Sequence, residues 1–401
     1  MKTGLRRLAI LGGTPAFAEP LHVGRPNIGN RQAFIRRVED MLDRRWFTNN
    51  GPYVQEFERR IAEMVGVKHC IAMCNATIGL EIATRAAGLR GEVIVPSFTF
   101  IATAHALQWQ EITPVFCDVA PGSHHIDPAQ VERMITPRTT GIIGVHVWGV
   151  PCDIEALTEI AQRRGLHLMF DAAHAFGCSY RGRMIGSFGE AEIFSFHATK
   201  FLNSFEGGAV CTNDDQLAER MRFMRNFGFA GVDDVDFIGT NGKMTEVCAA
   251  MGLTLLESLD EIIAINRRNY LAYRRVLAPL EGIQLYTYDE SERCNYQYVI
   301  VEVDETKTGI SRDALVKVLQ AENVLARRYF YPGAHQMEPY RSYFPHARLL
   351  LPETERLVQR VMSLPTGTAV SVQDIEKIGA IIEAAIAQRA EILEVLGCSV
   401  D

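Results

Sequence analysis

The clearest candidate for chemistry is an aspartate that follows an apolar run. The run that ends at Phe170 is followed by Asp171-Ala172-Ala173-His174, which puts Asp171 at the carboxyl end of a predicted strand. Ligands of open α/β sheets bind at this end of the strands. A carboxylate there can pair with a positively charged ring nitrogen of a bound group. The ordinary alternative is an aspartate that caps a turn or a helix, and one residue alone does not separate the two.

The second candidate is a lysine just past the next strand. The segment that starts at Ser195 reaches Lys200 through Phe196-His197-Ala198-Thr199 and precedes Gly207-Gly208. An amine beside apolar residues is poorly solvated, so its pKa falls and it can form an imine with an aldehyde. A surface lysine is the ordinary alternative. An imine-forming amine and an acid for a protonated ring nitrogen are the groups that pyridoxal phosphate (PLP) requires.

Two further segments carry weaker signals. Cys74-Asn75-Ala76-Thr77 is a small polar turn that leads into a helix, and amides at a helix N-terminus suit a phosphate. Ser195 could donate to the same phosphate. A plain helix cap explains the turn equally well. The segment Gly239–Met244 is, taken alone, an Asn-Gly turn.

The elements that position these residues follow from the apolar pattern. The sequence predicts strands at Glu92–Pro96, Thr113–Asp118, Gly141–Val147, Leu166–Asp171, Ala191–Phe196 and Gly208–Thr212. It predicts helices at Val54–Val65, Thr77–Gly88, Ile101–Gln110, Pro128–Ile135 and Asp153–Arg164. Nearly continuous apolar strands separated by helices indicate an α/β fold, with a mostly parallel sheet covered on both faces.

The pattern changes after residue 245. A long helix is predicted over Glu246–Leu277, then a strand at Tyr296–Val303, a helix at Ser311–Glu322 and a strand near Ala326–Tyr331; a last helix starts near Ser371, where the sequence has capping-box form. These elements indicate a smaller α+β C-terminal domain. We therefore expect an N-terminal arm at 1–30, a large domain at 31–265 and a small domain at 266–401.

Composition narrows the class of protein. A chain of 401 residues with 47% hydrophobic and 22% charged residues is an ordinary globular protein. The net charge of −7 and the lack of a basic run argue against nucleic acid as a partner. Nine scattered cysteines without a CxxC pair indicate reduced thiols, not disulfides or a metal site. With no signal peptide and no membrane-length apolar run, we expect a cytoplasmic protein that does not associate with a membrane.

The order of these segments resembles the DegT/StrS-type aminotransferases, which make amino sugars on nucleotide carriers. The likeness extends from Phe47-Thr48-Asn49-Asn50-Gly51-Pro52 to the region of Pro365. It implies the aspartate-aminotransferase-like fold (fold type I) of PLP enzymes, with PLP as the cofactor. Several motifs in the right order are more specific than any one of them.

The resemblance also implies a role for each matching residue. Lys200 would hold PLP as a Schiff base, Asp171 would pair with the pyridine nitrogen, and His174 would lie near the ring hydroxyl. The remaining matches are Phe100, which stacks on the ring, the phosphate contacts Ala76, Thr77 and Ser195, and Asn241, which reaches the phosphate in the neighbouring subunit. The protein should therefore be a homodimer with shared active sites.

The substrate expectation also comes from the resemblance. The segment Ala326–Gly333, with Phe330 and Tyr331, lines the substrate cleft in relatives, although an aromatic-rich strand is an equally good explanation. It is most similar to enzymes that aminate C4 of a 4-keto-6-deoxyhexose linked to dTDP. We expect a nucleotide sugar as acceptor, glutamate as donor, and a place in deoxyamino-sugar biosynthesis, including that of antibiotics.

Departures from the family pattern and rival functions remain. Relatives commonly have arginine at Lys243, a Ser-Gly-Thr type turn at residues 75–77, and a smaller or amide residue at His105. A pyridoxamine-dependent sugar dehydratase of the same fold would have histidine in place of Lys200. A regulatory protein that binds PLP without turnover is the other alternative. A nicotinamide oxidoreductase would need a GxGxxG fingerprint, and the sequence has none.

Overall fold

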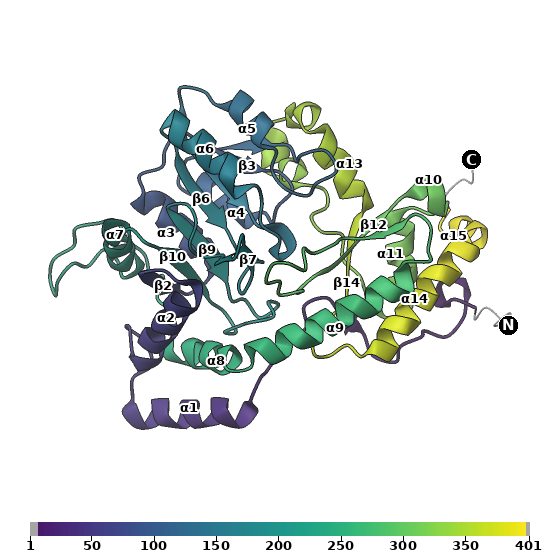
Figure 1. Ribbon diagram of the computed structural model, residues 1–401, viewed down its shortest axis with the longest axis horizontal. Coiled ribbons are helices and arrows are strands. Elements are labelled where there is room, and N and C mark those ends of the chain that lie inside the picture. The colour runs from purple at the N-terminus through teal and green to yellow at the C-terminus, as the bar shows by residue number, and fades with distance from the viewer. Residues whose placement is uncertain (1–6, 398–401) are drawn as a thin grey trace.

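The computed structural model describes residues 7–397. The largest sheet of this part has seven strands and forms the core of the larger of its two lobes (Figure 1). The strand order is β2-β10-β9-β6-β5-β3-β4, and only β10 runs antiparallel to its neighbours. The strands are β2 (His69–Met73), β3 (Glu92–Pro96), β4 (Thr113–Cys117), β5 (Thr139–Val145), β6 (His167–Asp171), β9 (Ala191–Ser195) and β10 (Gly208–Thr212). All six predicted strands are present, and β2 was not predicted. The carboxyl ends of the parallel strands meet at one edge of the sheet.

Both faces of this sheet are buried. Successive side chains of a strand point to opposite faces, so Leu168 and Phe170 join one apolar cluster while Met169, between them, joins another. The first cluster includes residues of four helices that fall within 52–65, 128–134, 154–164 and 246–256, and the second includes residues of three helices within 76–86, 102–108 and 215–225. The predicted mostly parallel sheet with helices on both faces is therefore confirmed.

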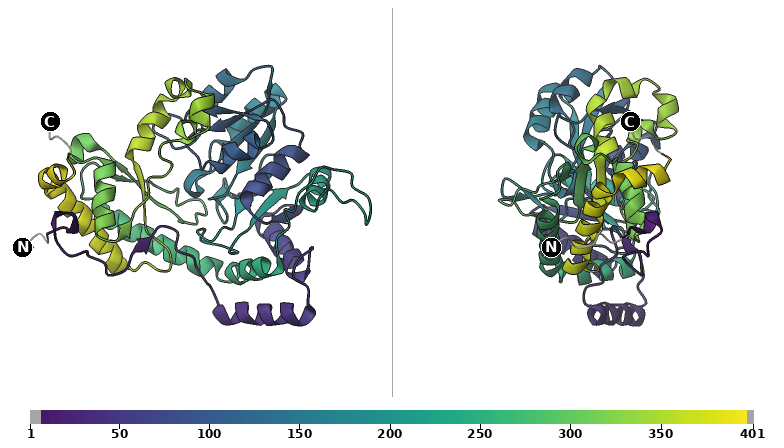
Figure 2. Two further views of the ribbon diagram at one scale, coloured as in Figure 1. Left: turned by 180° about the vertical axis from the view of Figure 1, so that it is seen from behind. Right: turned by 90° about the vertical axis from the view of Figure 1, so that its right-hand side faces the viewer.

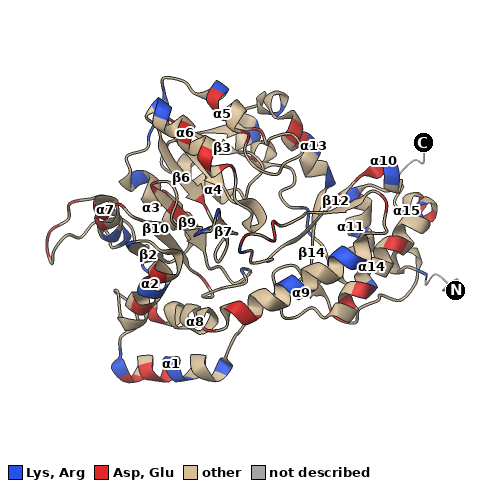
Figure 3. Cartoon of the chain, in the orientation of Figure 1, with Lys and Arg blue, Asp and Glu red and all other residues tan. Residues whose placement is uncertain are grey.

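The helices of this part surround the sheet. They are α1 (Arg31–Arg44), α2 (Pro52–Val65), α3 (Ala76–Ala86), α4 (Ala102–Gln108), α5 (Pro128–Met134), α6 (Ile154–Arg164), α7 (Asp215–Arg225) and α8 (Glu246–Leu256). Helix α1 lies at the outer edge beside α8, where Arg37 donates to Thr254 Oγ1 over 3.0 Å (Figures 1 and 2). Figure 3 shows residues of both charges on α1 and α2. A small hairpin joins β7 (Ser179–Tyr180) to β8 (Arg183–Met184).

The single long helix predicted over Glu246–Leu277 is wrong. The structure has two helices, α8 and α9 (Leu259–Leu277), because the backbone leaves the helical conformation at Ser258, with φ −106° and ψ 10°. Helix α8 is apolar and almost wholly buried in the large core, whereas α9 is amphipathic. Helix α9 contributes Leu259 to the large-domain cluster and Tyr273 to a separate C-terminal cluster, so it connects the two cores.

The C-terminal cluster forms a smaller α+β unit. Its antiparallel sheet has the order β11-β12-β14. The elements that follow α9 are β11 (Ile283–Leu285), β12 (Val299–Val303), α10 (Glu305–Thr308), α11 (Arg312–Ala321), α12 (Tyr340–Tyr343), α13 (Pro352–Arg360), β14 (Val361–Leu364), α14 (Val372–Ala387) and α15 (Arg389–Val395). Of these, α12 packs on the central sheet instead, where Tyr340 is buried. The predicted capping box is confirmed: Ser371 Oγ accepts from Asp374 N, and Asp374 accepts from Ser371 N.

The strand predicted near Ala326–Tyr331 is wrong. The extended segment there is only β13 (Val324–Leu325), and beyond it Tyr331 N bonds to Arg328 O in a turn. The aromatic side chains that suggested a strand pack in different directions. Phe330 stacks on Trp148, with 5.0 Å between ring centroids, whereas the Tyr331 ring lies under the Arg328 guanidinium.

The N-terminal segment packs against this C-terminal unit. Leu8, Leu11 and Phe17 are buried in its core, and β1 (Leu21–His22) pairs in parallel with β13. Both ends of the described chain lie on this side of the molecule (Figure 1). Residues 1–6 of the predicted arm, residues 398–401 of the predicted small domain and Cys398 lie outside the described part. The division at residue 265 stays a prediction, since α9 runs across it.

No helix within residues 7–397 combines the length and apolar character needed to span a membrane.

The eight cysteines in this part are free thiols, and six of them are buried.

Candidate active site

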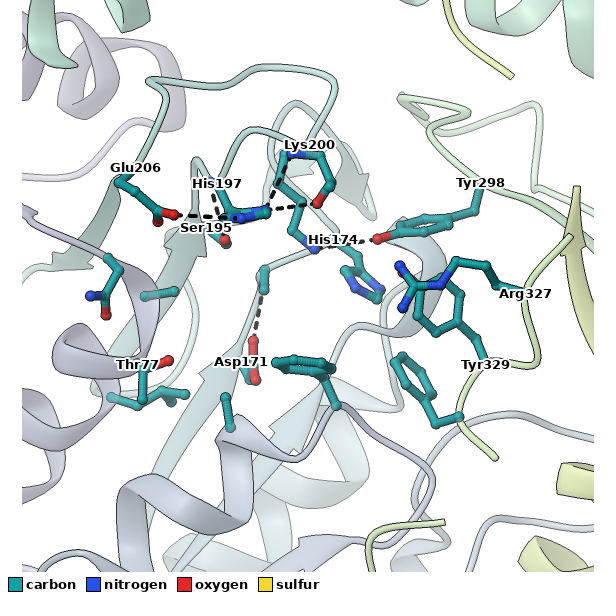
Figure 4. A pocket seen from close by; sticks show the side chains of 18 residues that line it. Thr77, Asp171, His174, Ser195, His197, Lys200, Glu206, Tyr298, Arg327 and Tyr329 are labelled. Atoms are coloured by element: carbon teal, nitrogen blue, oxygen red, sulfur yellow. Dashed lines mark hydrogen bonds and ion pairs between the residues drawn. The ribbon is translucent and has the colours of Figure 1, made fainter. Parts of the chain in front are cut away.

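A cavity of about 450 Å³ opens at the carboxyl edge of the central sheet. It lies where β2, β3, β6 and β9 end and where the segment after β13 approaches them (Figure 4). It is lined by Asn75, Ala76, Thr77, Leu80, Phe100, Ala102, Asp171, Ala173, His174, Ser195, His197, Thr199, Lys200, Glu206, Tyr298, Arg327, Tyr329 and Phe330. Most of the residues proposed from the sequence are therefore brought together.

The N-terminus of α3 forms one wall. Asn75 caps the helix by accepting from Ile78 N over 2.9 Å, which leaves Ala76 and Thr77 as the first helical residues at the cavity. Backbone N–H groups of a first turn have no partner within the helix. Gly208 on β10 lets this turn approach closely, because a Cβ there would lie 2.6 Å from Ala76 N. The wall is suited to an anion, as expected from the sequence.

Asp171 is the last residue of β6 and is held by two bonds. Its Oδ2 accepts from Thr103 Oγ1 over 2.7 Å, and its Oδ1 accepts from Ala173 N over 3.0 Å. Burial raises the pKa of Asp171, while these hydrogen bonds and the nearby Lys200 lower it. A buried carboxylate is costly unless a cation or further donors compensate it. Asp171 can therefore act as a fixed partner for a positively charged group in the cavity.

Lys200 lies on the loop between β9 and β10. Its Nζ donates to Tyr298 Oη over 3.3 Å (Figure 4). Burial lowers the pKa of Lys200 to about 8, and the charges of Tyr329 and Asp171 oppose that shift. A pKa lowered this far gives the amine a much larger neutral fraction at pH 7 to 8 than an ordinary lysine has, and the neutral amine is both a nucleophile and a base. Tyr298 was not predicted from the sequence, because it lies about 100 residues further along the chain and outside any recognised motif.

His174 is a neutral donor. Its Nδ1 accepts from Trp148 N over 3.2 Å, which leaves the proton on Nε2. Burial lowers the pKa of His174 well below its ordinary value, and the Lys200 charge acts in the same direction. The imidazole stacks on Trp148, at an interplanar angle of 18°. Trp148 has a left-handed backbone, φ 64°, within the 3-10 turn η2 (Val147–Gly149), and this turn directs its amide at the imidazole.

The segment after β13 supplies the remaining wall. Phe330 is buried, and the Arg327 guanidinium lies 4.7 Å from the centroid of the Tyr329 ring. Arg327 and Tyr329 were not predicted individually, although the segment was. An arginine beside two aromatic rings suits an anionic or planar ligand.

Two predicted site residues do not line the cavity. Asn241 is exposed at the base of the 226–241 hairpin, where it bridges to Asn226. Tyr331 faces Arg328 and Arg312 instead. Their proposed roles, like those of the residues inside the cavity, stay predictions. His105 bonds through Nδ1 to Tyr340 Oη over 2.8 Å, and Lys243 Nζ donates to Asn226 Oδ1 over 3.0 Å, both outside the cavity lining.

The DegT/DnrJ/EryC1/StrS aminotransferase family matches residues 29–383. This match covers most of the chain. The protein belongs to this family.

Individual relatives agree with that assignment. A dTDP-4-amino-4,6-dideoxy-D-glucose transaminase of Shigella dysenteriae is 37% identical over 322 residues, which cover 80% of this chain and 88% of the relative. The protein of the same name from Escherichia coli is 34% identical, over 89% of this chain and 96% of the relative. A crystal structure of DesI in the presence of its TDP-sugar product superposes with a TM-score of 0.93 at 51% identity, covering 98% of this chain and 99% of that one.

These findings confirm the predicted family and fold. The chain is an aminotransferase of the sugar-modifying DegT/DnrJ/EryC1/StrS family, with the fold of PLP-dependent aminotransferases. The functions weighed against it, a dehydratase and a regulatory protein, receive no support from these relatives, which are named as transaminases.

Proposed function

We propose that this aminotransferase uses pyridoxal 5'-phosphate to transfer an amino group from glutamate to C4 of a dTDP-linked 4-keto-6-deoxyhexose. The observation that carries the proposal is that one cavity contains both the buried carboxylate of Asp171 and the amine of Lys200, beside the open first turn of α3. Few ligands need all three of these features, and PLP needs each of them.

The residues present fit this cofactor. The buried Asp171 would hold a protonated pyridine nitrogen, and Nε2–H of His174 would donate to the ring hydroxyl. The amides of Ala76 and Thr77, with the hydroxyls of Thr77 and Ser195, are neutral donors suited to a phosphate at a helix N-terminus. Phe100, half-exposed at the cavity, offers an apolar face to the ring.

When bound, the cofactor supplies an aldehyde that accepts the amino group and a ring that withdraws electrons from it. Lys200 carries out the proton transfers. Its Nζ takes the proton from the α-carbon of glutamate in the first half-reaction and delivers one to C4 of the sugar in the second. The lowered pKa of about 8 allows Nζ to act as base and then as acid near neutral pH. The bond from Nζ to Tyr298 Oη directs the amine while it is free.

The acceptor is proposed from the relatives. Two of them are named dTDP-4-amino-4,6-dideoxy-D-glucose transaminases, and DesI was crystallised with a TDP-sugar product. Arg327 and Tyr329 at the cavity can meet an anionic donor or a nucleotide-linked sugar with charge and aromatic surface. The product would be a 4-amino-4,6-dideoxyhexose still linked to its nucleotide.

A shared active site is part of the proposal. The 226–241 hairpin exposes Phe227, Phe229, Val232, Val235 and Ile238. An exposed apolar group of this extent is typical of a protein interface. A second copy of the chain would cover it and bring Asn241 toward the phosphate end of the partner's cavity.

The transfer is tested with purified, PLP-loaded protein, glutamate and a panel of keto sugar nucleotides. We expect 2-oxoglutarate and an amino sugar only when a dTDP-linked 4-keto-6-deoxyhexose is present, with Lys200→Ala as the inactive control. Preferred turnover of a 3-keto isomer would contradict the proposed position of amination. The absence of transfer to every keto sugar would contradict the proposed function.

The shared site is tested by mixing two variants. Lys200→Ala removes the amine, and Asn241→Asp places a negative charge at the phosphate of the partner's site. In a heterodimer, one site contains both substitutions, and the other site combines an unchanged Lys200 with an unchanged Asn241. About half of the wild-type activity per heterodimer should therefore return. Heterodimers that form without regaining activity would show that Asn241 acts within its own chain or not at all.

A further inference from the structure

The loop that carries Lys200 has little regular structure of its own. Residues 196–207, between β9 and β10, form neither helix nor strand. Within the loop, Lys200 N bonds to His197 O and Ser204 N bonds to Phe196 O. A reactive side chain on a loop needs support from outside, because unsupported loop backbone moves more than a strand or a helix.

That support comes from the N-terminal segment, at Asn27. The Asn27 side chain is buried, 3% exposed, and its Nδ2 donates to Phe201 O over 2.8 Å. In return, Asn203 Nδ2 donates to Asn27 O over 3.0 Å. Both bonds are buried and join parts of the chain more than 170 residues apart. Asn27 therefore holds the loop immediately after Lys200.

A second contact of the same segment lies on the other side of the lysine. Gly24 has φ +74°, and a Cβ built on it would lie 3.0 Å from Thr199 O and 3.1 Å from Thr199 Cβ. Only a glycine reaches so close in this conformation without strain. Residues 24 and 27 of the arm thus contact the chain directly before and directly after Lys200.

The third contact of Asn27 leads to the C-terminal unit. Thr368 Oγ1 donates to Asn27 Oδ1 over 2.6 Å. The segment that carries Thr368 is fixed in turn by Asn269 of α9, whose Nδ2 donates to Gly367 O over 3.0 Å. One amide side chain therefore connects the Lys200 loop, the N-terminal arm and the small domain.

We propose that Asn27 is a positioning residue of this enzyme: it fixes the backbone on which Lys200 moves and couples that backbone to the small domain through Thr368. The proposal rests on the proposed role of Lys200 as the reactive amine. Lys200 Nζ must leave and return to the same point in every turnover, so its backbone has to stay in place while the side chain moves. The irregular loop around Lys200 does not hold its own backbone in place, and the bonds of Asn27 do so from outside the loop.

The test compares Asn27→Ala with the wild type, both without cofactor, by hydrogen–deuterium exchange. Peptides that cover residues 199–204 should exchange about tenfold faster in the variant, because it loses the buried bond from Asn27 Nδ2 to Phe201 O and the bond from Thr368 Oγ1 to Asn27 Oδ1. The pH dependence of Lys200 acylation, followed by mass spectrometry, should move toward the ordinary lysine range, since a looser loop admits water. After loading with PLP, kcat should fall about tenfold with KM nearly unchanged, because misplacement of a reacting group by about 1 Å costs up to about a hundredfold.

Asn30→Ala is the matched control. Asn30 is the same residue type in the same segment, but its Oδ1 caps α1 by accepting from Ala33 N over 3.0 Å, whereas the Asn27 side chain bonds to Phe201 of the Lys200 loop. Loop exchange and Lys200 acylation in this variant should match the wild type. Thr368→Val should give an intermediate effect, since it removes only the bond to the small domain.

Unchanged loop exchange and an unchanged acylation profile in Asn27→Ala would overturn the proposal. If that variant does not fold, Asn27→Asp decides: it keeps the acceptor for Thr368 but cannot donate to Phe201 O, so fast loop exchange supports the proposal and wild-type exchange refutes it. These measurements need neither cofactor nor substrate. If the wild-type protein has no transaminase activity, the proposed function is refuted. The exchange data would still show whether Asn27 holds the Lys200 loop.

Discussion

Asp171 and Lys200 line the same cavity, but the chain holds them in different ways. Asp171 ends a buried strand of the central sheet, and its partners Thr103 and Ala173 belong to the same domain. Lys200 lies on an irregular loop that depends on Asn27, Thr368 and Tyr298, which come from the N-terminal arm and the C-terminal part. Asp171 is therefore positioned by the sheet, and Lys200 by contacts that join distant parts of the chain.

The difference in how the two side chains are held agrees with the role proposed for each. A carboxylate that only has to hold a charge benefits from a rigid strand, whereas an amine that moves protons between two carbons needs a free side chain on a fixed backbone. Four predictions test this contrast, from the largest expected effect to the smallest.

The first removes the mobile group. Lys200→Ala should abolish transamination, because no other amine among the residues that line the cavity can take up the proton. After PLP loading, borohydride reduction and peptide mapping should label Lys200 in the wild type and nothing in the variant. Lys377→Ala, on the exposed face of α14, is the control and should behave as the wild type. A label on another lysine would refute the assignment.

The second concerns the burial of that amine. The pKa of Lys200 is lowered to about 8, so between about pH 8 and 10.5 the unfolded chain holds a proton that the folded chain has released. The free energy of unfolding of the cofactor-free protein should therefore rise with pH across this window, by up to about 3 kcal/mol, and lose that increment as pH falls to 8. Lys200→Met should be more stable than the wild type at pH 7, with a gap that closes toward pH 10.5.

Denaturant unfolding of both proteins at several pH values measures this gap. A gap between Lys200→Met and the wild type that does not change with pH would show that Lys200 is solvated in the folded protein.

The third prediction neutralises the fixed group. Asp171→Asn should keep the fold and lose turnover by about tenfold to a hundredfold, which corresponds to the roughly 1.5–3 kcal/mol of one charged hydrogen bond. An amide cannot supply the charge that keeps a ring nitrogen protonated. Steady-state rates and thermal unfolding separate the two effects. A rate within twofold of the wild type would mean that Asp171 has no charge partner.

The fourth and smallest effect weakens only the support of Asp171. Thr103→Val removes the 2.7 Å bond to Oδ2 and should lower kcat about two- to tenfold, from the roughly 0.5–1.5 kcal/mol of a neutral donor. Thr99→Val serves as the control, because the Thr99 hydroxyl reaches Asp171 only through Thr103. A larger loss in Thr99→Val than in Thr103→Val would contradict a direct role of Thr103.

Much of the sheet could be predicted because its strands are buried on both faces. The predicted bounds of β3 and β10 agree with the structure residue for residue. Strand β2 was missed, since His69–Met73 has a single branched residue and follows the glycine that ends α2 without a clear turn signal. The break between α8 and α9 was missed because apolar residues recur at helical spacing on both sides of Glu257 and Ser258.

The candidate site divides in the same way. Residues carried by local motifs at strand ends, such as Asp171, Ser195 and Lys200, could be selected from the sequence. Tyr298 and Asn27 could not, because each reaches the site from a distant segment whose local sequence resembles any other loop or strand. Tyr331 was selected with its aromatic neighbours, but the turn at residues 328–331 directs it away from the cavity.

The antiparallel β10 has a consequence for biosynthesis. Within the described sheet, β10 is the only strand that pairs with β2. During synthesis, more than a hundred residues must therefore follow β2 before its partner Gly208–Thr212 leaves the ribosome. At about 5–20 residues per second, this wait lasts several seconds or more. A nascent chain shorter than this lacks the strand that pairs with β2. Release of a truncated chain before residue 208 therefore leaves the backbone groups of β2 unpaired, and unpaired strand edges are templates for aggregation.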